Sequence, residues 1–343
     1  MKMNKIRKNK ISETDILDEY VVYYSKCIHS NLEERRFIYK LKTHCGLLVL
    51  KTSSTRIDLM FPDIGYDDKM KLVEKIKKEP EYMEICKESD HFAKLRKYRI
   101  NNELGIVEIL MDHHGKSLQT KLNDYIGGSP EFSVILNWMK GCVEAMAFLE
   151  EKKIYHGDIK PGNILLDDNS CIKITDLGES QKIDHGYNST IARHEMKQIF
   201  GISKDFASPE IISYFNFAEF KEFKGYIGSC DIYSLGLTFW VILKVIGKSK
   251  EEMNSFYVEL HGKYYKMRNK KPEAFKKEVM NTKLKNQEIE NKFLPILANM
   301  MNFNEKERIS FKNLRKIFKI YDDSTADQIQ SYMFGKPSNS LLI

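Results

Sequence analysis

The 343-residue sequence lacks the signatures of secreted, disulfide-bonded and membrane proteins. Its six cysteines are scattered, with no C-x-x-C pair and no metal-ligand spacing, so we expect reduced thiols and an intracellular protein, cytoplasmic or nuclear. The basic start, M-K-M-N-K-I-R-K-N-K, is followed by no apolar core and therefore does not read as a secretory signal. The longest apolar run, Leu235 to Leu243, stops at Lys244 and is too short to cross a bilayer. We therefore expect no membrane partner.

Internal repeats and low-complexity tracts are also absent, apart from a general richness in Lys and Asn. The composition, 42% hydrophobic and 30% charged, is that of a globular protein, and the length is typical of two lobes around a cleft. The net charge of +7 is spread along the chain, although the first ten residues are basic. A solvated N-terminal tail over residues 1–18 explains them better than a nucleic-acid or membrane contact. The sequence indicates neither an oligomeric state nor a particular protein substrate.

The chain is organised around the stretch from Ile154 to Gly178, which reads I-Y-H-G-D-I-K-P-G-N-I-L-L-D-D-N-S-C-I-K-I-T-D-L-G. It predicts a loop that leaves a helix and enters a tight hairpin. Residues 164–166 and 171–174 are apolar strands, and residues 167–170 form the polar turn between them. The hairpin folds the chain back on itself, so residues on either side of it should meet.

Four polar side chains lie along this stretch: Asp158, Lys160, Asn163 and Asp176. The hairpin is expected to bring Asp176 close to the other three. Two carboxylates, an amide and an ammonium group can hold a divalent metal on a polyphosphate and orient a hydroxyl beside it. A polar turn that only caps backbone groups explains any one of these residues, but it does not explain all four at this spacing.

The stretch resembles the catalytic and metal-binding loops of the eukaryotic-type protein kinases, H-R-D-x-K-x-x-N followed by D-F-G. Gly157 stands in place of the family's Arg, and Leu177 in place of the Phe. The resemblance implies an α+β, two-lobed fold with a small, mostly antiparallel β lobe that carries one helix, and a larger, mainly α-helical lobe. It places the kinase domain at residues 19–321, with the small lobe over 19–109, the hinge and large lobe over 110–321, and a C-terminal tail over 322–343.

The resemblance also implies ATP and Mg²⁺ as cofactors and assigns roles to single residues. Asp158 would accept the proton of a substrate hydroxyl, and Lys160, which is typical of Ser/Thr-directed members, would neutralise the transferring phosphoryl group. The remaining assignments are Asn163 and Asp176 for the metal, Lys51 for the phosphates, and Ile109, Met111 and Leu165 for the nucleotide.

Three strands are predicted near the start, at residues 20–24, 36–41 and 47–51, and two more at 92–100 and 105–110. The third ends in L-V-L-K, which resembles the kinase V-A-I-K and makes Lys51 the phosphate ligand. A helix is predicted from Asp67 to about Lys87, with a break at Pro80. Its Glu81 is our candidate to pair with Lys51, with Glu74 and Glu84 as alternatives.

In the family, a glycine-rich loop between the first two strands covers the phosphates. Here that position, residues 27–35, contains no glycine and brings Glu33 and Glu34 instead. In the fifth strand, Glu108 would lie at the back of the nucleotide pocket, whereas a shift of one residue would put Ile109 there. These features leave the strength of ATP binding open.

Residues beyond the hairpin match further family motifs. A core helix is predicted to start at Ser129-Pro130 and to deliver the chain into the catalytic loop. The resemblance implies that Ser203 contacts Asp158 and Lys160, that Asp231 fixes the backbone of the catalytic loop, and that Arg308 pairs with Glu210 of F-A-S-P-E.

The leading hypothesis is a Ser/Thr protein kinase. The alternatives are a pseudokinase or weakly active scaffold, which the glycine-free loop favours, and a small-molecule kinase of the aminoglycoside or choline kinase type. Because Gly157 replaces the Arg that often pairs with a phosphorylated activation segment, we expect activity not to depend on phosphorylation of Ser180, Ser189, Thr190 or Ser203.

Overall fold

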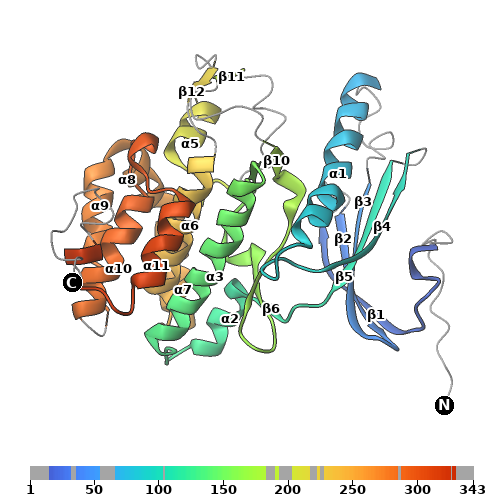
Figure 1. The fold of residues 1–343 in the computed structure, drawn as a ribbon, viewed down its shortest axis with the longest axis horizontal. Helices are drawn as coiled ribbons and strands as arrows, with labels where there is room; N and C mark the ends of the chain where they lie inside the picture. Colours follow the sequence, from blue (N-terminus) through green and yellow to red (C-terminus); the bar gives the residue numbers. More distant parts are fainter. Residues whose placement is uncertain are drawn as a thin grey trace, which may run out of the picture. The chain divides into compact units, whose positions relative to one another are not determined.

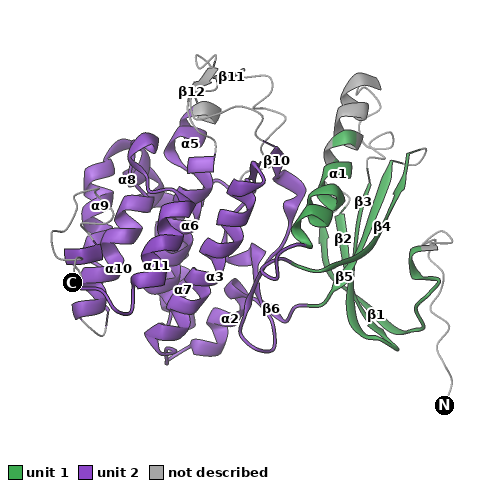
Figure 2. Ribbon diagram, viewed as in Figure 1, with its two compact units in different colours: residues 1–87, 93–113 green, residues 88–92, 114–343 purple. Residues whose placement is uncertain are grey.

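The computed structural model describes residues 15–31, 36–54, 66–102, 105–182, 190–192, 203–216, 222–224, 228–284, 287–325 and 327–329. The chain forms two compact units, one of residues 1–87 and 93–113 and one of residues 88–92 and 114–343 (Figure 2). The first unit is rich in β-structure and the second is mainly helical, which confirms the predicted fold class. The boundary falls after His113 and not after residue 109.

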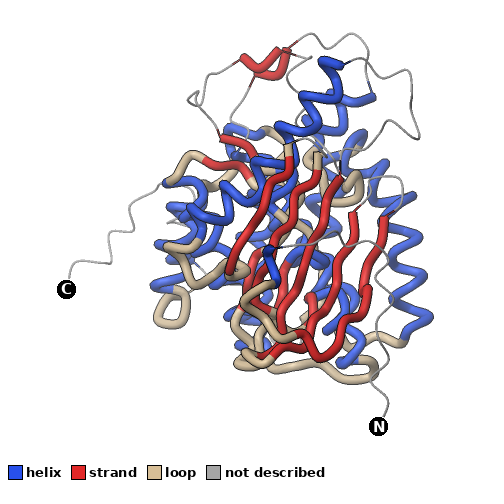
Figure 3. Tube along the Cα trace, turned by 90° about the vertical axis from the view of Figure 1, so that its right-hand side faces the viewer, coloured by secondary structure: helices blue, strands red, loops and turns tan. Residues whose placement is uncertain are grey.

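Unit 1 is built on a five-stranded antiparallel sheet in the order β1-β2-β3-β5-β4, whose strands lie side by side in Figure 3. One helix, α1 (Tyr66–Cys86), packs against the sheet (Figure 1). The strands are β1 (Val22–Asn31), β2 (Arg36–Thr43), β3 (Gly46–Ser54), β4 (Leu95–Asn101) and β5 (Ile106–Asp112).

The first hairpin of this sheet corrects the predicted loop at residues 27–35. Strand β1 continues to Asn31 and pairs with β2 up to Arg36, with an irregularity between Cys27 and His29. Residues 27–31 contain no glycine, and their pairing with β2 extends the strand through part of the expected loop. Only residues 32–35 connect the strands, and Glu33 and Glu34 therefore lie outside the described residues.

A short 3₁₀ helix, η1 (Asp15–Leu17), corrects the predicted N-terminal tail. Its Ile16 is 1% exposed and belongs to an apolar cluster with Leu41, Leu48, Leu50 and Leu110. Burying an isoleucine contributes about 1.5–3 kcal/mol, enough to hold this segment against the sheet. The packed chain therefore starts before residue 19. Residues 1–14 lie outside the described part.

Unit 2 contains the remaining helices and four short strand pairs (Figure 1). The α-helices are α2 (Leu118–Lys121), α3 (Phe132–Glu151), α5 (Pro209–Asn216), α6 (Gly228–Val245), α7 (Lys250–Glu259), α8 (Tyr265–Lys270), α9 (Pro272–Met280), α10 (Gln287–Met300) and α11 (Phe311–Ile320). A π-helical turn, η6 (Leu260–Tyr264), joins α7 to α8, and the 3₁₀ turns are η3 (Leu122–Tyr125), η4 (Pro161–Asn163), η5 (Leu177–Glu179) and η7 (Glu305–Glu307). The strands are β6 (Lys116–Ser117), β7 (Ile154–Tyr155), β8 (Ile164–Leu166), β9 (Ile172–Ile174), β10 (Gln181–Lys182), β11 (Thr190–Ala192) and β12 (Glu222–Lys224), paired as β6-β8-β9, β7-β10 and β11-β12.

Helix α3 is a core helix of unit 2, as its helical spacing of apolar residues predicts. It begins at Phe132, two residues after the predicted proline start, with Glu131 preceding it. It is the one described helix long and apolar enough to cross a membrane by length and composition, and 56% of that apolar window is buried inside the protein. Trp138, Met139 and Cys142 are nearly inaccessible to solvent.

Helix α6 is buried along almost its whole length and forms the centre of unit 2. Its Trp240 makes edge-to-face ring contacts with Tyr264 and Phe275, at centroid distances of 5.1 Å and 5.2 Å. The indole Nε1 donates to Thr282 Oγ1 at 3.0 Å, so the buried polar atom is satisfied. This aromatic cluster holds η6 and α9 against α6.

The predicted C-terminal tail is not wholly free. Lys140 of α3 forms a 2.8 Å ion pair with Asp322, and Ile329 is fully buried. An apolar side chain removed from water keeps residues 327–329 on the body of unit 2. Part of the predicted tail, Asp322 and Ile329, thus contacts unit 2. Residues 330–343 lie outside the described part.

Candidate functional site

The loop after β7 is held by a carboxylate of α6. Asp231 accepts the backbone N–H of His156 through Oδ2 at 2.7 Å and that of Gly157 through Oδ1 at 3.0 Å. Burial raises the pKa of Asp231 to about 7, although both N–H groups act in the opposite direction because they favour the ionised carboxylate. The predicted role of Asp231 in fixing this backbone agrees with these contacts.

The His156 imidazole joins the two ends of the hairpin. Its Nδ1 accepts from the Asp158 N–H at 3.2 Å, and Nε2 lies 3.2 Å from the Thr175 carbonyl oxygen. A neutral ring with its proton on Nε2 satisfies both contacts. Burial lowers the pKa of His156 and so favours that neutral form.

Gly157 adopts a left-handed backbone with φ of 87°. A Cβ at this position would lie 2.7 Å from the carbonyl oxygen of Glu179 and 3.1 Å from Tyr155 Cε1. Glycine is therefore required by both the dihedral angle and the close approach of a second backbone segment.

Asp158, Lys160, Asn163 and Ser203 form one hydrogen-bonded group. Lys160 Nζ donates to Asp158 Oδ2 at 2.6 Å and to Ser203 Oγ at 2.7 Å. Asn163 Nδ2 donates to the same Oδ2 at 3.0 Å and to the Asp158 carbonyl oxygen at 2.8 Å. Both cationic and amide donors thus engage one carboxylate oxygen, while Asp158 Oδ1 accepts no hydrogen bond from the residues that the structure describes.

The hairpin returns the chain to Asn163 at Thr175, one residue before Asp176. Strands β8 and β9 pair from Ile164↔Ile174 onward, and the Thr175 N–H donates to the Asn163 carbonyl oxygen at 3.0 Å. Asp176 follows in a left-handed conformation, φ 65° and ψ 68°, which aspartate tolerates better than most residues.

These residues suit Mg²⁺. Both donor contacts of the Asn163 amide nitrogen go to Asp158, so its carbonyl oxygen would be the ligand atom, and Asp176 would supply a carboxylate. Within the described ranges, no group of three or more His, Cys, Asp or Glu side chains is arranged for a metal. Mg²⁺ is commonly bound by one or two protein oxygens together with substrate phosphates and water, and that is the arrangement this donor set allows.

Of the four hydroxyl residues considered as phosphorylation positions after the hairpin, Ser180 and Ser203 form contacts in the described structure. Ser180 is 3% exposed and donates to the His156 carbonyl oxygen at 3.1 Å, while Ser203 accepts from Lys160. The contact between Ser203 and Lys160 was predicted. Ser189 lies outside the described residues, as does the side chain of Thr190.

In unit 1, Lys51 pairs with Glu79 and not with Glu81. Lys51 Nζ lies 2.6 Å from Glu79 Oε1, and both side chains are 6% exposed. Glu79, Tyr82, Met83 and Cys86 form the buried face of α1, whereas Glu81 is exposed on the opposite side. The alternatives, Glu74 and Glu84, pair with neighbouring lysines on the surface.

The error in the predicted partner came from the phase of α1. The helix continues through Pro80, where a break was predicted, and Pro80 itself is buried. The spacing of Glu79 from Tyr82, Met83 and Cys86, at i+3, i+4 and i+7, was the signal in the sequence that identifies the buried face.

The register of β5 decides between Glu108 and Ile109. Ile109 is directly opposite Lys51, so the two share a face of the sheet, whereas Glu108 is opposite Thr52 and Arg99 on the other face. Arg99 donates to Glu108 Oε2 at 2.7 Å through Nε, and burial raises the pKa of this carboxyl despite that contact. The register therefore favours Ile109 over Glu108 at the back of the predicted nucleotide pocket, and this placement stays a prediction.

The other predicted nucleotide contacts are placed as follows. Ile109 and Met111 are buried in β5 at 1% and 6% exposure. Leu165 is half-buried in β8, between Ser117 of β6 and Lys173 of β9. Their contacts with a nucleotide remain a prediction.

The predicted pair of Arg308 and Glu210 is present and bidentate. Arg308 Nη1 and Nη2 lie 2.5 Å and 2.8 Å from the two oxygens of Glu210, and the Arg308 side chain is fully buried. Burial alone would raise the pKa of Glu210, but the charge and hydrogen bonds of Arg308 outweigh it and lower this pKa. The pair fixes the start of α5.

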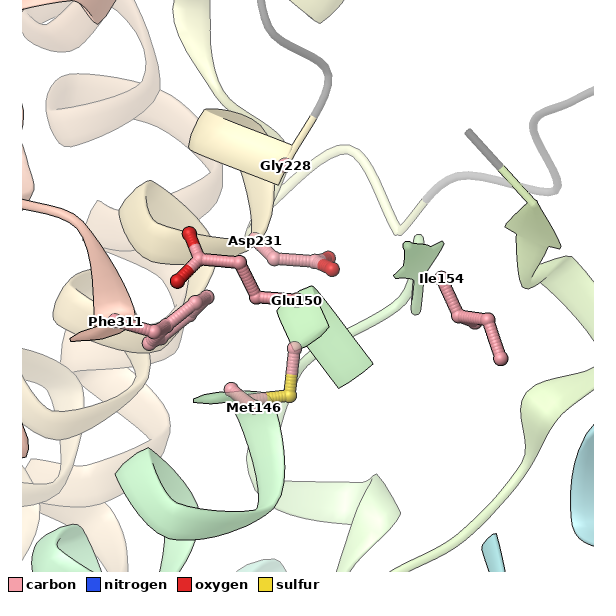
Figure 4. A pocket seen from close by; sticks show the side chains of 6 residues that line it. All are labelled: Met146, Glu150, Ile154, Gly228, Asp231 and Phe311. Carbon is pink, nitrogen blue, oxygen red and sulfur yellow. The ribbon is translucent and has the colours of Figure 1, made fainter. Parts of the chain in front are cut away.

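A small cavity of about 10 Å³ lies between α3, β7, α6 and the start of α11, next to the loop that follows β7 (Figure 4). Asp231 and Glu150 border it, and burial raises the pKa of Glu150. One water molecule needs about this volume, whereas a ligand pocket is usually some 300–1,000 Å³. The cavity therefore belongs to the scaffold next to the loop.

Comparison with known proteins agrees with this geometry. The family profile described as "Protein kinase domain" matches residues 65–317. The serine/threonine-protein kinase STE11 of Saccharomyces cerevisiae is 37% identical over 102 residues, which are 29% of this chain and 14% of that protein. The CBL-interacting serine/threonine-protein kinase 10 of Arabidopsis thaliana is 26% identical over 204 residues, 59% of this chain and 38% of that protein. A probable serine/threonine-protein kinase of Dictyostelium discoideum is 31% identical over 150 residues, 43% and 30% of the two chains. These matches span less than two fifths of each relative.

Proposed function

Because the chain belongs to the eukaryotic-type protein kinase family, we propose that it transfers the γ-phosphoryl group of ATP to serine and threonine hydroxyls of protein substrates. The observation that carries this proposal is the hydrogen bonding of Asp158. Its Oδ2 is engaged by Lys160 and Asn163, which leaves Oδ1 as the acceptor for a substrate hydroxyl.

Each residue then has a defined task. Asp158 Oδ1 orients the hydroxyl and takes its proton as the oxygen attacks the γ-phosphorus and ADP leaves. Lys160 stabilises negative charge on the transferring group, and Ser203 fixes the ammonium of Lys160 at 2.7 Å. Lys51, oriented by Glu79, binds phosphate oxygens. Mg²⁺, held by Asn163 and Asp176, would neutralise charge on the phosphates.

The type of residue at position 160 supports a protein hydroxyl as acceptor. Small-molecule kinases of the aminoglycoside and choline type usually carry His at this position and lack an F-A-S-P-E end and the Asp231 helix. This chain has Lys160, the Glu210–Arg308 pair and the Asp231 contacts. We also infer an intracellular location, which the six free cysteines support.

Radiolabelled ATP with a generic protein substrate tests the proposal. Asp158→Asn should lower transfer by at least about 100-fold, since a positioned base contributes roughly 10²–10⁴. Lys51→Ala should lower it as well, by weakening the hold on the phosphates. Asp168→Asn is the matched control, because Asp168 is an exposed residue of the turn between β8 and β9. Transfer that is equal in Asp158→Asn and wild type would contradict the assignment.

A pseudokinase is the second candidate, because β1 and β2 are joined by only four residues and none of them is glycine. Glycine lets backbone N–H groups approach phosphates, so its absence weakens this part of the binding. Equilibrium binding of Mg-ATP separates the two candidates. Wild-type protein that binds no Mg-ATP and transfers no phosphate would favour the scaffold function.

A further inference from the structure

The turn formed by residues 203–207, which we call the acceptor turn, is anchored at both ends. At its start, Ser203 Oγ accepts from Lys160 at 2.7 Å. Within it, the N–H groups of Phe206 and Ala207 donate to the Ser203 carbonyl oxygen at 2.9 Å and 3.1 Å. Any shift of the turn therefore moves the hydroxyl that holds Lys160 beside Asp158.

At its far end the turn is held by a buried arginine of α8. Arg268 is 1% exposed and donates through Nη1 to the Ala207 carbonyl oxygen at 3.3 Å and through Nη2 to that of Lys204 at 3.4 Å. Among the described residues Arg268 forms no ion pair, and its Nε has no hydrogen-bond partner. Besides a side-chain hydrogen bond with Tyr233, this guanidinium donates to two carbonyls of a single turn. Because a buried cation is costly, this arrangement indicates a requirement for that turn's position.

The segment that precedes Arg268 is packed against α6. The π-helical turn η6 comes directly before α8, and its Tyr264 packs edge-to-face on Trp240 of α6 at 5.1 Å. In the same turn, His261 Nδ1 lies 2.5 Å from Asp205 Oδ1 of the acceptor turn. π-helical turns are frequent at functional sites. Two side chains from this short region thus reach the same five-residue turn.

We propose that Arg268 is a positioning residue for protein substrates, acting through Ser203 on Lys160 and Asp158. This inference rests on the proposed function. A guanidinium suits the role because its planar fork can reach two carbonyl oxygens at once, which a lysine ammonium cannot do with the same geometry. Substitution of Arg268 should impair phosphoryl transfer to the protein substrate more than it impairs nucleotide binding. The two carbonyl oxygens that accept its hydrogen bonds belong to Ala207 and Lys204, and neither residue is assigned to the nucleotide.

Steady-state kinetics with Arg268→Met tests the proposal. The kcat/KM for a peptide substrate should fall about tenfold, the scale of one lost charge-assisted hydrogen bond. The affinity for Mg-ATP should stay within about twofold, and Arg268→Lys should recover part of the loss. Lys270→Met, at an exposed position on the same helix, is the matched control and should change neither quantity. Equal losses for peptide and Mg-ATP would indicate a general structural defect and overturn the proposal.

A double-mutant cycle tests the path through Ser203. In a Ser203→Ala background, Arg268→Met should have a much smaller effect on kcat/KM for the peptide, because residues that act in one network are not additive. Full additivity would contradict the path.

Hydrogen exchange keeps the proposal testable even if the protein transfers no phosphate. Arg268→Met should speed exchange of the Phe206 and Ala207 amides by at least about tenfold, while amides of α3 stay protected. Unchanged exchange at both amides would sink the positioning role. Wild-type protein without phosphoryl transfer would instead sink the proposed function, so the two failures are distinguishable.

Discussion

At the scale of single residues, Gly157 has little freedom to change. Gly157→Ala should destabilise the protein by at least about 1–2 kcal/mol, because an L-residue is disfavoured in the left-handed region and its Cβ would meet the Glu179 carbonyl at 2.7 Å. Urea unfolding measures the loss. Gly128→Ala is the control, since a Cβ there meets nothing within 4 Å. A stability equal to wild type in Gly157→Ala would contradict the close contact.

The same glycine bears on regulation. Because position 157 offers no guanidinium to a phosphate, we expect the double variant Ser189→Ala/Thr190→Ala to keep wild-type transfer to a protein substrate, within about twofold. Activity of protein treated with a phosphatase is the second measurement. A loss of activity in either experiment, restored by phosphorylation of one of these residues, would show that regulation does not require an arginine here.

Residue-level prediction from sequence was most successful where the groups are close along the chain. One hairpin separates Asp176 from the group formed by Asp158, Lys160 and Asn163. The strands and the turn of this hairpin can be recognised in the local sequence, so the sequence alone predicts that the chain returns to this group. Glu79 and Lys51 are 28 positions apart and meet through the packing of α1 on the sheet. That contact depends on helix phase, which a nearby proline obscured.

At the scale of elements, the buried face of α1 predicts opposite outcomes for two glutamates separated by two positions. Glu79→Ala should cost about 3–5 kcal/mol of stability, because it removes the carboxylate beside a buried ammonium. Glu81→Ala should stay within about 0.5 kcal/mol, because its side chain is exposed. Chemical denaturation of both variants and of the wild type measures these differences in the free energy of unfolding. The reverse order would restore Glu81 as the partner of Lys51.

Strand β1 shows why element boundaries were harder to predict than element types. Its first residues alternate clearly and were recognised, but the strand continues through residues 27–31, which we had interpreted as a loop. The pairing of Ser30 with Phe37 and of Asn31 with Arg36 extends the strand to within four residues of β2. Cross-strand pairing is a non-local contact, and residues 27–31 on their own favour it only weakly.

At the scale of the whole molecule, the Glu210–Arg308 pair joins segments 98 positions apart and makes the fold sensitive to acid. The pKa of Glu210 is lower in the folded protein than its usual value of 4.5, so its contribution is complete above pH 4.5 and is lost as the pH falls through the folded pKa. We therefore expect the stability difference between wild type and Glu210→Gln to be constant from pH 7 to 5 and to shrink below about 4.5.

Urea unfolding of both proteins at several pH values measures this difference. The comparison with Glu210→Gln isolates one carboxyl from all the others that titrate in the same range. A difference that shrinks between pH 7 and 5, or one that stays constant down to pH 3, would contradict the lowered pKa of Glu210.

The two ends of the chain show the limit of prediction from sequence at this scale. Composition favours solvated tails over residues 1–18 and 322–343, yet Ile16 and Ile329 are each buried in a different unit. A single isoleucine within a polar segment has no periodicity around it. The burial of Ile16 depends on an apolar cluster with residues that are distant in sequence, such as Leu41 and Leu110. No local sequence pattern reveals that cluster.

The close approach of Gly157 and Glu179 also limits how this loop could be redesigned. Gly157→Arg, which would install the residue typical of the family, would place a Cβ 2.7 Å from the Glu179 carbonyl oxygen in a left-handed backbone. A guanidinium could therefore be introduced at this position only together with a second change that moves the backbone of Glu179.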